Sequence, residues 1–461
     1  MVMSTRRRCR FLDLTHLCSC LYLTMLATCS LLSCVVYIFY GISSSASVLA
    51  TSTATASLES ASFKDHGRYV HLMCSMSNIT RVQYVAVIDA GSTGSRIHVY
   101  QFEKDDADGS FRFQLEIYFE VSPGLSAYAF TPTKGANSIR PLLEVAKLAV
   151  PRVMWRQTPL VIKATAGLRL LTSQVAHSLL NEVYKILLET DFLLPPDAVE
   201  VIDGIAEGFF GWMTVNYLIG AFNKQGKLAV SMDLGGGSTQ LSLVPTHKGT
   251  ISSLPPEDLQ NIYLFNSHYK VYTHSYLGLG LISARFQMMD ATEGGEDSPY
   301  VKDRILKSSC LPSQYEGVLK HGPNIYSIRG MDPVDTGFTG CYKSALQVLS
   351  GANIRVVPEM KQMTIYAFAY YFDIAVDAKL IDKHGGVLKI TDYKNAALKE
   401  CSSHGEHRFL CMDLTYIYTL LRAGFQLDDS TVLHVKHIEN GGELSWSLGM
   451  AYHILSSVID V

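Results

Sequence analysis

Two short segments of the chain combine an aspartate with glycines and hydroxyl residues: VIDAGSTGS at Val87–Ser95 and SMDLGGGSTQ at Ser231–Gln240. Each follows an apolar run that is typical of a β-strand and precedes a second, alternating run. Each is therefore predicted to be a turn that joins two strands. The leading Asp89 and Asp233 are 144 residues apart, about the length of one domain. This repetition predicts two related halves that face each other across a cleft and hold one phosphate chain from both sides.

The residue types in these turns favour phosphate binding. Glycine lets an oxygen-rich ligand approach main-chain N–H groups, and hydroxyl side chains add further donors. Asp89 and Asp233 would repel a phosphate directly, but they can hold a hydrated Ca²⁺ or Mg²⁺ that contacts it. The predicted phosphate-binding residues of the turns are Gly91, Ser92, Thr93, Gly94, Gly235, Gly236, Gly237 and Ser238.

Composition indicates a globular protein that begins with a membrane anchor. The 461 residues are 48% hydrophobic and 18% charged, with a net charge of −3, which gives no indication of nucleic-acid binding. Four arginines within the first ten residues precede an uncharged stretch, 17–40, about 36 Å long as a helix. The positive-inside rule then predicts a cytosolic tail (1–16), a transmembrane signal-anchor (17–40) and a lumenal stalk (41–81). The alternative is a cleavable signal peptide, because Ser44–Ala50 offers small residues for cleavage.

The cysteines and one sequon fit a lumenal location. An oxidising lumen favours disulfides, and we expect Cys310–Cys341 and Cys401–Cys411, although four cysteines permit three pairings. Cys74 is left over and could bridge two chains or stay free. Asn78 begins an N-x-T glycosylation sequon.

Three further segments accompany the two turns in a fixed order: KATAGLRLL at Lys163–Leu171, IDGIAEGFFGWMTVNYLIG at Ile202–Gly220, and WSLGMAYHILSS at Trp446–Ser457. Together the five blocks resemble the apyrase family of nucleoside phosphatases, the nucleoside triphosphate diphosphohydrolases. YTHSYLGLGLISAR at Tyr272–Arg285 looks like the Golgi/ER branch of that family, whose members prefer nucleoside diphosphates.

The resemblance implies an α/β fold of two actin/hexokinase/Hsp70-like domains with the active site in the cleft between them. The first domain would comprise 82–202 together with 446–461, and the second 203–445. Sequence patterns agree with helices at Asn137–Val150 and Ser173–Glu189 in the first half.

The resemblance also implies roles for individual residues. Glu207 would be the general base, Ser238 and Gln240 would position the attacking water, and Thr165 would contact phosphate. Glu207 directly precedes the predicted helix Gly208–Gly220. Without the surrounding blocks, it would instead be interpreted as a helix-start carboxylate, and Gln240 could face solvent. Arg169 is left unassigned.

Two aromatic residues near the blocks, Tyr276 and Trp446, are candidates to contact the base, although Trp446 could simply pack the last helix. The chain departs from the family pattern at Ala206, where an acidic residue is common, and at Gly237, where alanine is common. The missing acid would lower the pKa of Glu207.

The predicted function is hydrolysis of nucleoside diphosphates, UDP and GDP, with Ca²⁺ or Mg²⁺, in the Golgi or ER lumen. The product monophosphate would support glycosylation, and cleavage of the stalk would release a soluble form. One alternative is a broad ATP/ADP apyrase at the cell surface or secreted. Another is a nucleotide sensor that does not hydrolyse, which the intact set of Glu207, Ser238 and Gln240 disfavours. A kinase is disfavoured because a lumen offers little ATP. The oligomeric state stays open.

Overall fold

The computed structural model describes residues 4–7, 81–105, 109–223, 226–289, 305–322, 324–331, 337–403 and 407–458. Its contacts divide the chain into a body, residues 82–461 with the first six residues, and a second unit, residues 7–81. The predicted anchor, the stalk, Cys74 and Asn78 lie outside the described residues. Within the part of the chain that is described, no helix has the length and apolar character needed to cross a membrane.

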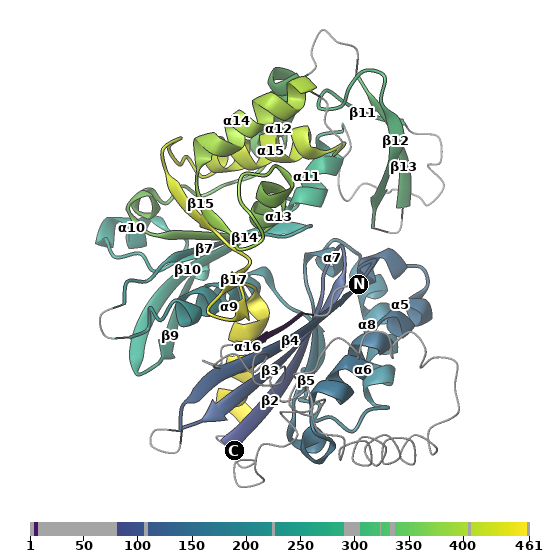
Figure 1. Ribbon diagram of the computed structural model, residues 1–461, viewed down its shortest axis with the longest axis vertical. Helices are drawn as coiled ribbons and strands as arrows, with labels where there is room; N and C mark the ends of the chain where they lie inside the picture. The colour runs from purple at the N-terminus through teal and green to yellow at the C-terminus, as the bar shows by residue number, and fades with distance from the viewer. Residues whose placement is uncertain are drawn as a thin grey trace, which may run out of the picture. The chain divides into compact units, whose positions relative to one another are not determined.

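The first half of the body is built on a six-stranded mixed sheet with the order β1-β4-β3-β2-β5-β6 (Figure 1). Its central strand β2 is buried over most of its length because it is almost continuously apolar. β3 and β4 run antiparallel beside it, and β5 and β6 are parallel to it. The strands are β1 (Ser4–Arg7), β2 (Val82–Ala90), β3 (Ser95–Lys104), β4 (Phe111–Val121), β5 (Leu160–Ala164) and β6 (Val199–Val201).

The edge strand β1 bears on the predicted membrane topology. It comes from the arginine-rich start of the chain and lies beside β4 in the sheet of the body. The charge pattern of the sequence instead predicts that residues 1–16 and the body lie on opposite sides of a membrane. Residues 4–7 cannot both pair with β4 and lie across a membrane from it, so the membrane topology stays a prediction.

Helices cover the first sheet with apolar faces that the sequence encodes at helical spacing. The predicted helix at Asn137–Val150 is interrupted, because α5 ends at Ser138 and Pro141 lies near the start of α6. The predicted helix at Ser173–Glu189 corresponds closely to α8. The helices of this half are α5 (Pro132–Ser138), α6 (Arg140–Ala149), α7 (Ala166–Arg169) and α8 (Ser173–Leu187), with 3₁₀ turns at Leu125–Tyr128 and Arg152–Gln157.

The second half is built on a seven-stranded mixed sheet with the order β15-β16-β14-β7-β8-β10-β9. β7 pairs in parallel with β14 and antiparallel with β8, as β2 does with β5 and β3. The strands are β7 (Val230–Leu234), β8 (Ser238–Leu243), β9 (Leu259–Leu264), β10 (Ser267–Leu277), β14 (Ile365–Ala369), β15 (Gly386–Lys389) and β16 (Val432–Val435). Two short strands, β17 (Ile438–Glu439) and β18 (Gly442–Glu443), form a separate hairpin.

The second sheet is covered by a larger set of helices whose buried side chains form one apolar core with it. These helices are α10 (Lys248–Ser253), α11 (Leu281–Gln287), α12 (Gly337–Ser350), α13 (Tyr370–Asp377), α14 (Ile390–Ser403) and α15 (Leu410–Thr419), with 3₁₀ turns at Pro256–Asp258 and Pro358–Gln362 and a π-helical turn at Leu420–Gly424.

Two helices pack together beside both sheets: α9 (Gly204–Leu218) and α16 (Trp446–Val458). α9 is apolar all round, as expected for a helix buried on every side. It packs on β7, β8 and β10, while α16 returns to β2 and β3. Their side chains share one core with residues of both sheets, including Trp212 and Trp446. The chain therefore has an α/β fold of two mixed sheets joined through a helix pair.

A small three-stranded sheet extends from the second half beside α11 (Figure 1). It comprises β11 (Ile305–Ser308), β12 (Glu316–His321) and β13 (Asn324–Gly330). Both predicted disulfides are confirmed, with S–S distances of 2.10 Å for Cys310–Cys341 and 2.06 Å for Cys401–Cys411. The first ties the small sheet to α12, and the second ties α14 to α15.

Loss of the Cys310–Cys341 bridge, with both cysteines replaced by serine, should lower the free energy of unfolding by roughly 3–4 kcal/mol. This bridge joins residues 31 apart, whereas Cys401–Cys411 joins residues 10 apart. The shorter loop should contribute less, about 2–3 kcal/mol. Chemical denaturation measures both values, with Cys74→Ser as the control that breaks neither bridge. An unchanged denaturation midpoint without Cys310 and Cys341 would contradict this expectation.

Candidate active site

The two aspartate–glycine turns occupy equivalent places in the two sheets. The first joins β2 to β3 and the second joins β7 to β8, so the prediction that each joins two strands is confirmed. Asp89 is the residue before the end of β2 and pairs with Arg96, and Asp233 is the residue before the end of β7 and pairs with Gln240. The two halves thus present the same hairpin, each with an aspartate at the end that carries the turn.

Two glycines lie against Ser92 of the first turn. Gly236, in the second turn, is close to the Ser92 hydroxyl, so a Cβ at Gly236 would displace that hydroxyl. Gly167, in α7, packs on the main chain, because a Cβ there would lie 2.7 Å from Ser92 Cα. Between the turns lies a cavity of about 260 Å³ whose lining comes from both halves.

Most of the predicted site residues line this one cavity. Gly94 is not part of the lining and lies against the side chain of Glu120. The predicted residues in the lining are Asp89, Gly91, Ser92, Thr93, Thr165, Glu207, Asp233, Gly235, Gly236, Gly237, Ser238 and Trp446.

Packing explains why this chain has Gly237 at a position where the family pattern often has alanine. A Cβ at Gly237 would lie 2.9 Å from the Cβ of Ala166. The glycine therefore accommodates Ala166, the residue that follows Thr165.

Glu207 enters the cavity from the first turn of α9. The helix begins at Gly204, earlier than the predicted start at Gly208, because Asp203 caps it by accepting a hydrogen bond from the N–H of Ala206 at 2.7 Å. Although it is a charged residue, Glu207 is only 7% exposed. A carboxylate this buried needs hydrogen-bond donors around it.

Arg169 and Gln240 supply those donors. Arg169 Nη2 donates to Glu207 Oε2 at 2.5 Å, and Gln240 Nε2 donates to the same oxygen at 3.1 Å. Both also reach Ser238 Oγ, at 3.1 and 2.7 Å. Gln240 is buried in β8 behind Ser238, so it does not face solvent. The structure thus brings Glu207, Ser238 and Gln240 into one hydrogen-bonded group.

Arg169 belongs to this hydrogen-bonded group, although the sequence patterns assigned it no role. It lies at the end of α7, 38 positions from Glu207 along the chain, and only the fold brings the two together. Its place in the KATAGLRLL block, beside Thr165, was the one signal available in the sequence.

Burial raises the pKa of Glu207 to about 7, although Arg169 acts to lower it and Asp89 adds to the increase. Burial determines the direction of this shift. The expected effect of Ala206, a lower pKa than an acidic neighbour would give, stays a prediction. A carboxyl group with this pKa can accept a proton from water near neutral pH.

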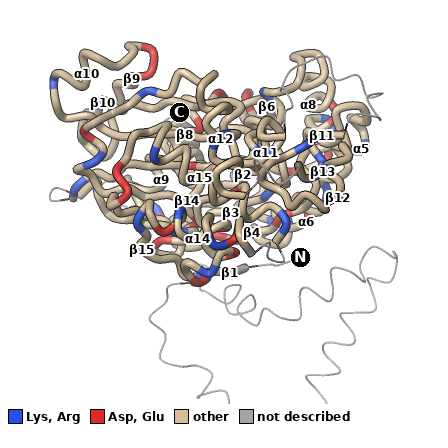
Figure 2. The backbone as a smooth tube through the Cα atoms, turned by 90° about the horizontal axis from the view of Figure 1, so that it is seen from above, with Lys and Arg blue, Asp and Glu red and all other residues tan. Residues whose placement is uncertain are grey.

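The lining carries an excess of negative charge. Among the described lining residues are six carboxylates, and the one permanently charged cation is Arg96. Elsewhere in the described chain, positive and negative residues are interspersed (Figure 2). The six carboxylates belong to Asp89, Glu120, Glu207, Asp233, Asp373 and Glu443. A cation bound among these carboxylates would favour the entry of an anionic substrate.

Asp89 and Asp233 suit a hard divalent cation. Asp89 Oδ1 is buried with no hydrogen-bond partner, so one carboxylate oxygen is available to a metal-bound water. Burial raises the pKa of Asp89 to about 6 and that of Asp233 well above its usual range. A bound cation would oppose both shifts by favouring the ionised carboxylates.

The two aromatic candidates lie in different places. Trp446 lines the cavity at the start of α16 and is also packed in the core. Tyr276 does not line it, because its side chain is buried and its hydroxyl accepts a hydrogen bond from the N–H of Arg355 at 3.1 Å. Phe368 and Tyr370, which no sequence pattern singled out, are aromatic residues in the lining.

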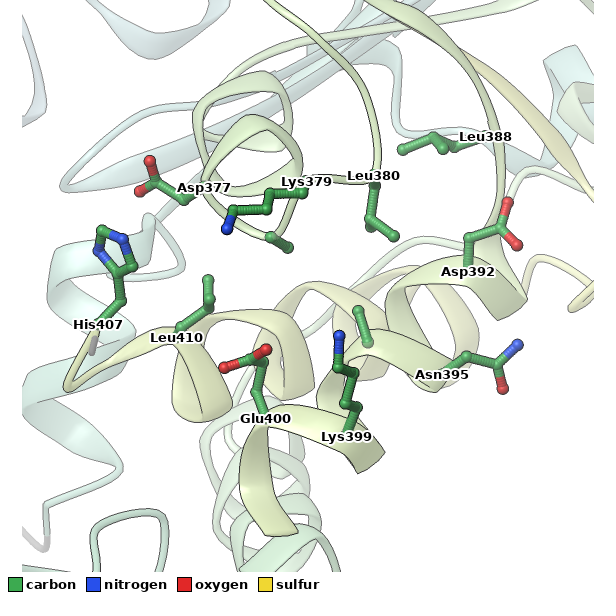
Figure 3. Close-up of a pocket in the computed structure, with 12 residues that line it drawn as sticks. Asp377, Lys379, Leu380, Leu388, Asp392, Asn395, Lys399, Glu400, His407 and Leu410 are labelled. Atoms are coloured by element: carbon green, nitrogen blue, oxygen red, sulfur yellow. The ribbon is translucent and has the colours of Figure 1, made fainter. Parts of the chain in front are cut away.

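A larger cavity, of about 820 Å³, lies in the second half between α13, α14 and α15. Figure 3 shows charged side chains of both signs around it, among them Asp377, Lys379, Lys399 and Glu400. It contains neither of the paired turns nor Glu207. We therefore assign the chemistry to the smaller cavity.

Comparison with known proteins finds a family whose sequence pattern includes segments that form this site. The sequence pattern of the GDA1/CD39 (nucleoside phosphatase) family matches residues 75–354. The chain belongs to this family. The match covers both turns and the segments that carry Thr165, Arg169 and Glu207, and the resemblance inferred from the sequence is confirmed.

Relatives extend the likeness over most of the chain. The ectonucleoside triphosphate diphosphohydrolase 5 of Gallus gallus is 42% identical and covers 84% of this chain and 90% of its own. The nucleoside diphosphate phosphatase ENTPD5 of Homo sapiens is 39% identical over 85% of this chain and 92% of its own. The human ectonucleoside triphosphate diphosphohydrolase 6 is 38% identical over 82% and 78%.

A solved structure shares the fold. The chain superposes on nucleoside triphosphate hydrolases from Neospora caninum with a TM-score of 0.57 and 13% sequence identity, covering 87% of this chain and 97% of that chain. At this identity the likeness supports the two-sheet architecture alone.

Proposed function

We propose that the chain is a hydrolase that converts nucleoside diphosphates, with UDP and GDP as substrates, to nucleoside monophosphate and phosphate. The observation that carries this proposal is the joined group of Glu207, Ser238 and Gln240 beside two facing phosphate-type turns. Membership of a nucleoside phosphatase family and likeness to a named nucleoside diphosphate phosphatase support it. The two-sheet architecture fits the actin/hexokinase/Hsp70-like arrangement that the resemblance implies.

In this mechanism Glu207 removes a proton from water. Arg169 and Gln240 both donate hydrogen bonds to Oε2 of Glu207. Oε1 is therefore the oxygen that accepts the proton. Ser238 accepts hydrogen bonds from the same two donors, so its hydroxyl proton is directed away from them and can orient the water. The attack then occurs from a fixed position beside the turns.

The turns hold the phosphate that is cleaved. Main-chain N–H groups and hydroxyls from Gly91–Thr93 and Gly235–Gly237 surround it, and Thr165 adds a hydroxyl from a third segment. A Ca²⁺ or Mg²⁺ held through water by Asp89 and Asp233 would offset charge on the phosphate oxygens.

Phosphate release from UDP, GDP, ADP, UTP and ATP tests the proposal. The full chain, purified in detergent, would be assayed with Ca²⁺, with Mg²⁺ and with EDTA. Cation-dependent turnover that favours UDP and GDP would support a nucleoside diphosphatase. Comparable turnover of ATP and ADP would indicate a broad apyrase, and binding without turnover would indicate a sensor.

The location in the cell is part of the proposal. The Arg-rich start followed by the uncharged stretch 17–40 supports a type II protein of the Golgi or ER with a lumenal body. The two disulfides of the body fit an oxidising compartment. Protease protection in isolated membranes tests this topology, because a lumenal body is digested only after detergent opens the membrane.

The pH dependence of kcat/KM should report the ionisation of Glu207. Because the base works deprotonated, kcat/KM should rise with pH through about 7 and fall about tenfold per unit below it. Arg169 lowers this pKa, so Arg169→Gln should move the midpoint upward and reduce kcat. Arg169→Lys, which keeps the charge, is the control. If Arg169→Gln has the same midpoint as the wild type, the ionisation that controls kcat/KM does not belong to Glu207.

A further inference from the structure

The proposed reaction fixes where the cleaved phosphate of the nucleotide lies in the cavity. Glu207, Ser238 and the two turns determine where the cleaved phosphate lies, whichever nucleotide is bound. A nucleotide with one more phosphate must therefore place that phosphate farther out, between the turns and the nucleoside.

The lining of the cavity is poor in permanent positive charge. One wall is the face of β3 and β4 that carries Arg96, His98 and Glu120. Arg96 is the one arginine or lysine among the described lining residues, and it already faces two carboxylates. Its Nη2 lies 2.9 Å from Glu120 Oε1 and its Nη1 lies 3.8 Å from Asp89 Oδ2.

Two further carboxylates, Glu443 and Asp373, line the same cavity as Glu207. Glu443, in β18, is buried, and its Oε1 lies 3.9 Å from Nδ1 of His437. Asp373 lies in the first turn of α13, one turn after Tyr370, and is exposed to solvent. A carboxylate oxygen of Glu443 lies within 4.8 Å of side-chain atoms of His98 and Glu116, which places Glu443 at the wall that carries Arg96.

We propose that Glu443 and Asp373 make this cavity select nucleoside diphosphates over triphosphates by repelling the additional phosphate. The inference rests on the proposed function and names residues that determine its specificity. A triphosphate brings about one more negative charge than a diphosphate into the same space. Because the cavity is partly shielded from water, that charge meets stronger repulsion than it would in solution.

The two carboxylates should contribute unequally. Glu443 is buried, so solvent screens its charge little. Asp373 is exposed, so its effect should be smaller and should weaken as salt is added. The diphosphate is accommodated because its remaining phosphate can lie beside Arg96 and a cation at Asp89.

The test compares kcat/KM for UTP with kcat/KM for UDP in the full chain with saturating Mg²⁺. In Glu443→Gln the UTP/UDP ratio should rise about tenfold, and in Asp373→Asn about threefold. Glu400→Gln removes a carboxylate from the larger cavity and should leave the ratio unchanged. If Glu443→Gln fails to fold, the exposed Asp373→Asn and its salt dependence keep the test decisive.

The outcomes separate this inference from the proposed function. A raised ratio in the variants, with the control unchanged, supports it. An unchanged ratio, or equal losses with UDP and UTP, overturns it while leaving the diphosphatase intact. A wild-type chain that hydrolyses no UDP refutes the proposed function itself, and the inference with it.

Discussion

Replacement of Glu207 by glutamine should reduce kcat for UDP by at least about a thousandfold. The amide keeps the size of the side chain and its place between Arg169 and Gln240, but it cannot accept a proton from water. Nucleotide binding, measured by calorimetry with Mg²⁺, should change by less than about threefold, because the phosphate contacts come from the turns.

Two comparisons keep this result interpretable. Glu182→Gln makes the same chemical change on the surface of α8, where the glutamate pairs with Lys185, and should leave turnover unchanged. Thermal unfolding of Glu207→Gln shows whether the loss of rate comes from misfolding. A correctly folded variant with near-normal turnover would show that Glu207 is not the general base.

Removal of divalent cations with EDTA should lower the rate at least about a hundredfold, because the cavity would then bring a phosphate chain against its own carboxylates. Added Ca²⁺ or Mg²⁺ should restore the rate, and titration of each identifies the preferred ion. Activity that persists in EDTA after dialysis would contradict the proposed role of Asp89 and Asp233.

The same titration tests the two aspartates individually. Asp89→Asn and Asp233→Asn should each raise the cation concentration that gives half-maximal rate by at least about tenfold. Glu400→Gln, outside the cavity, serves again as the control. Equal cation requirements in wild type and both variants would show that the ion binds elsewhere.

Local chemistry explains which parts of the site could be predicted. A turn is specified by adjacent residues, so the sequence alone correctly predicts that the aspartate–glycine segments lie between strands. The same holds for the helix that becomes α8. Helix starts were less accurate, because the cap that begins α9 at Gly204 depends on one side chain, Asp203, whose capping role the pattern of apolar residues does not reveal.

Distances between remote segments explain what could not be predicted. The bond from Arg169 to Glu207 joins α7 to α9, and the contact of Ser92 with Gly236 joins the two halves. Tyr276 was selected for lying in a family-like segment, yet the fold turns it into the core. Its neighbours along the chain carry no information about that orientation.

The sequence by itself determined the family, the paired turns and the identity of Glu207 as the candidate base, because each depends on residues that are contiguous or matched as blocks. Only the tertiary structure decided how those residues act together. It buried Glu207 and so raised its pKa, placed Arg169 and Gln240 on one of its oxygens, and gathered six carboxylates around one cavity. Burial and electrostatic coupling depend on separation in space, and residues distant in the sequence reach that separation only when the chain folds.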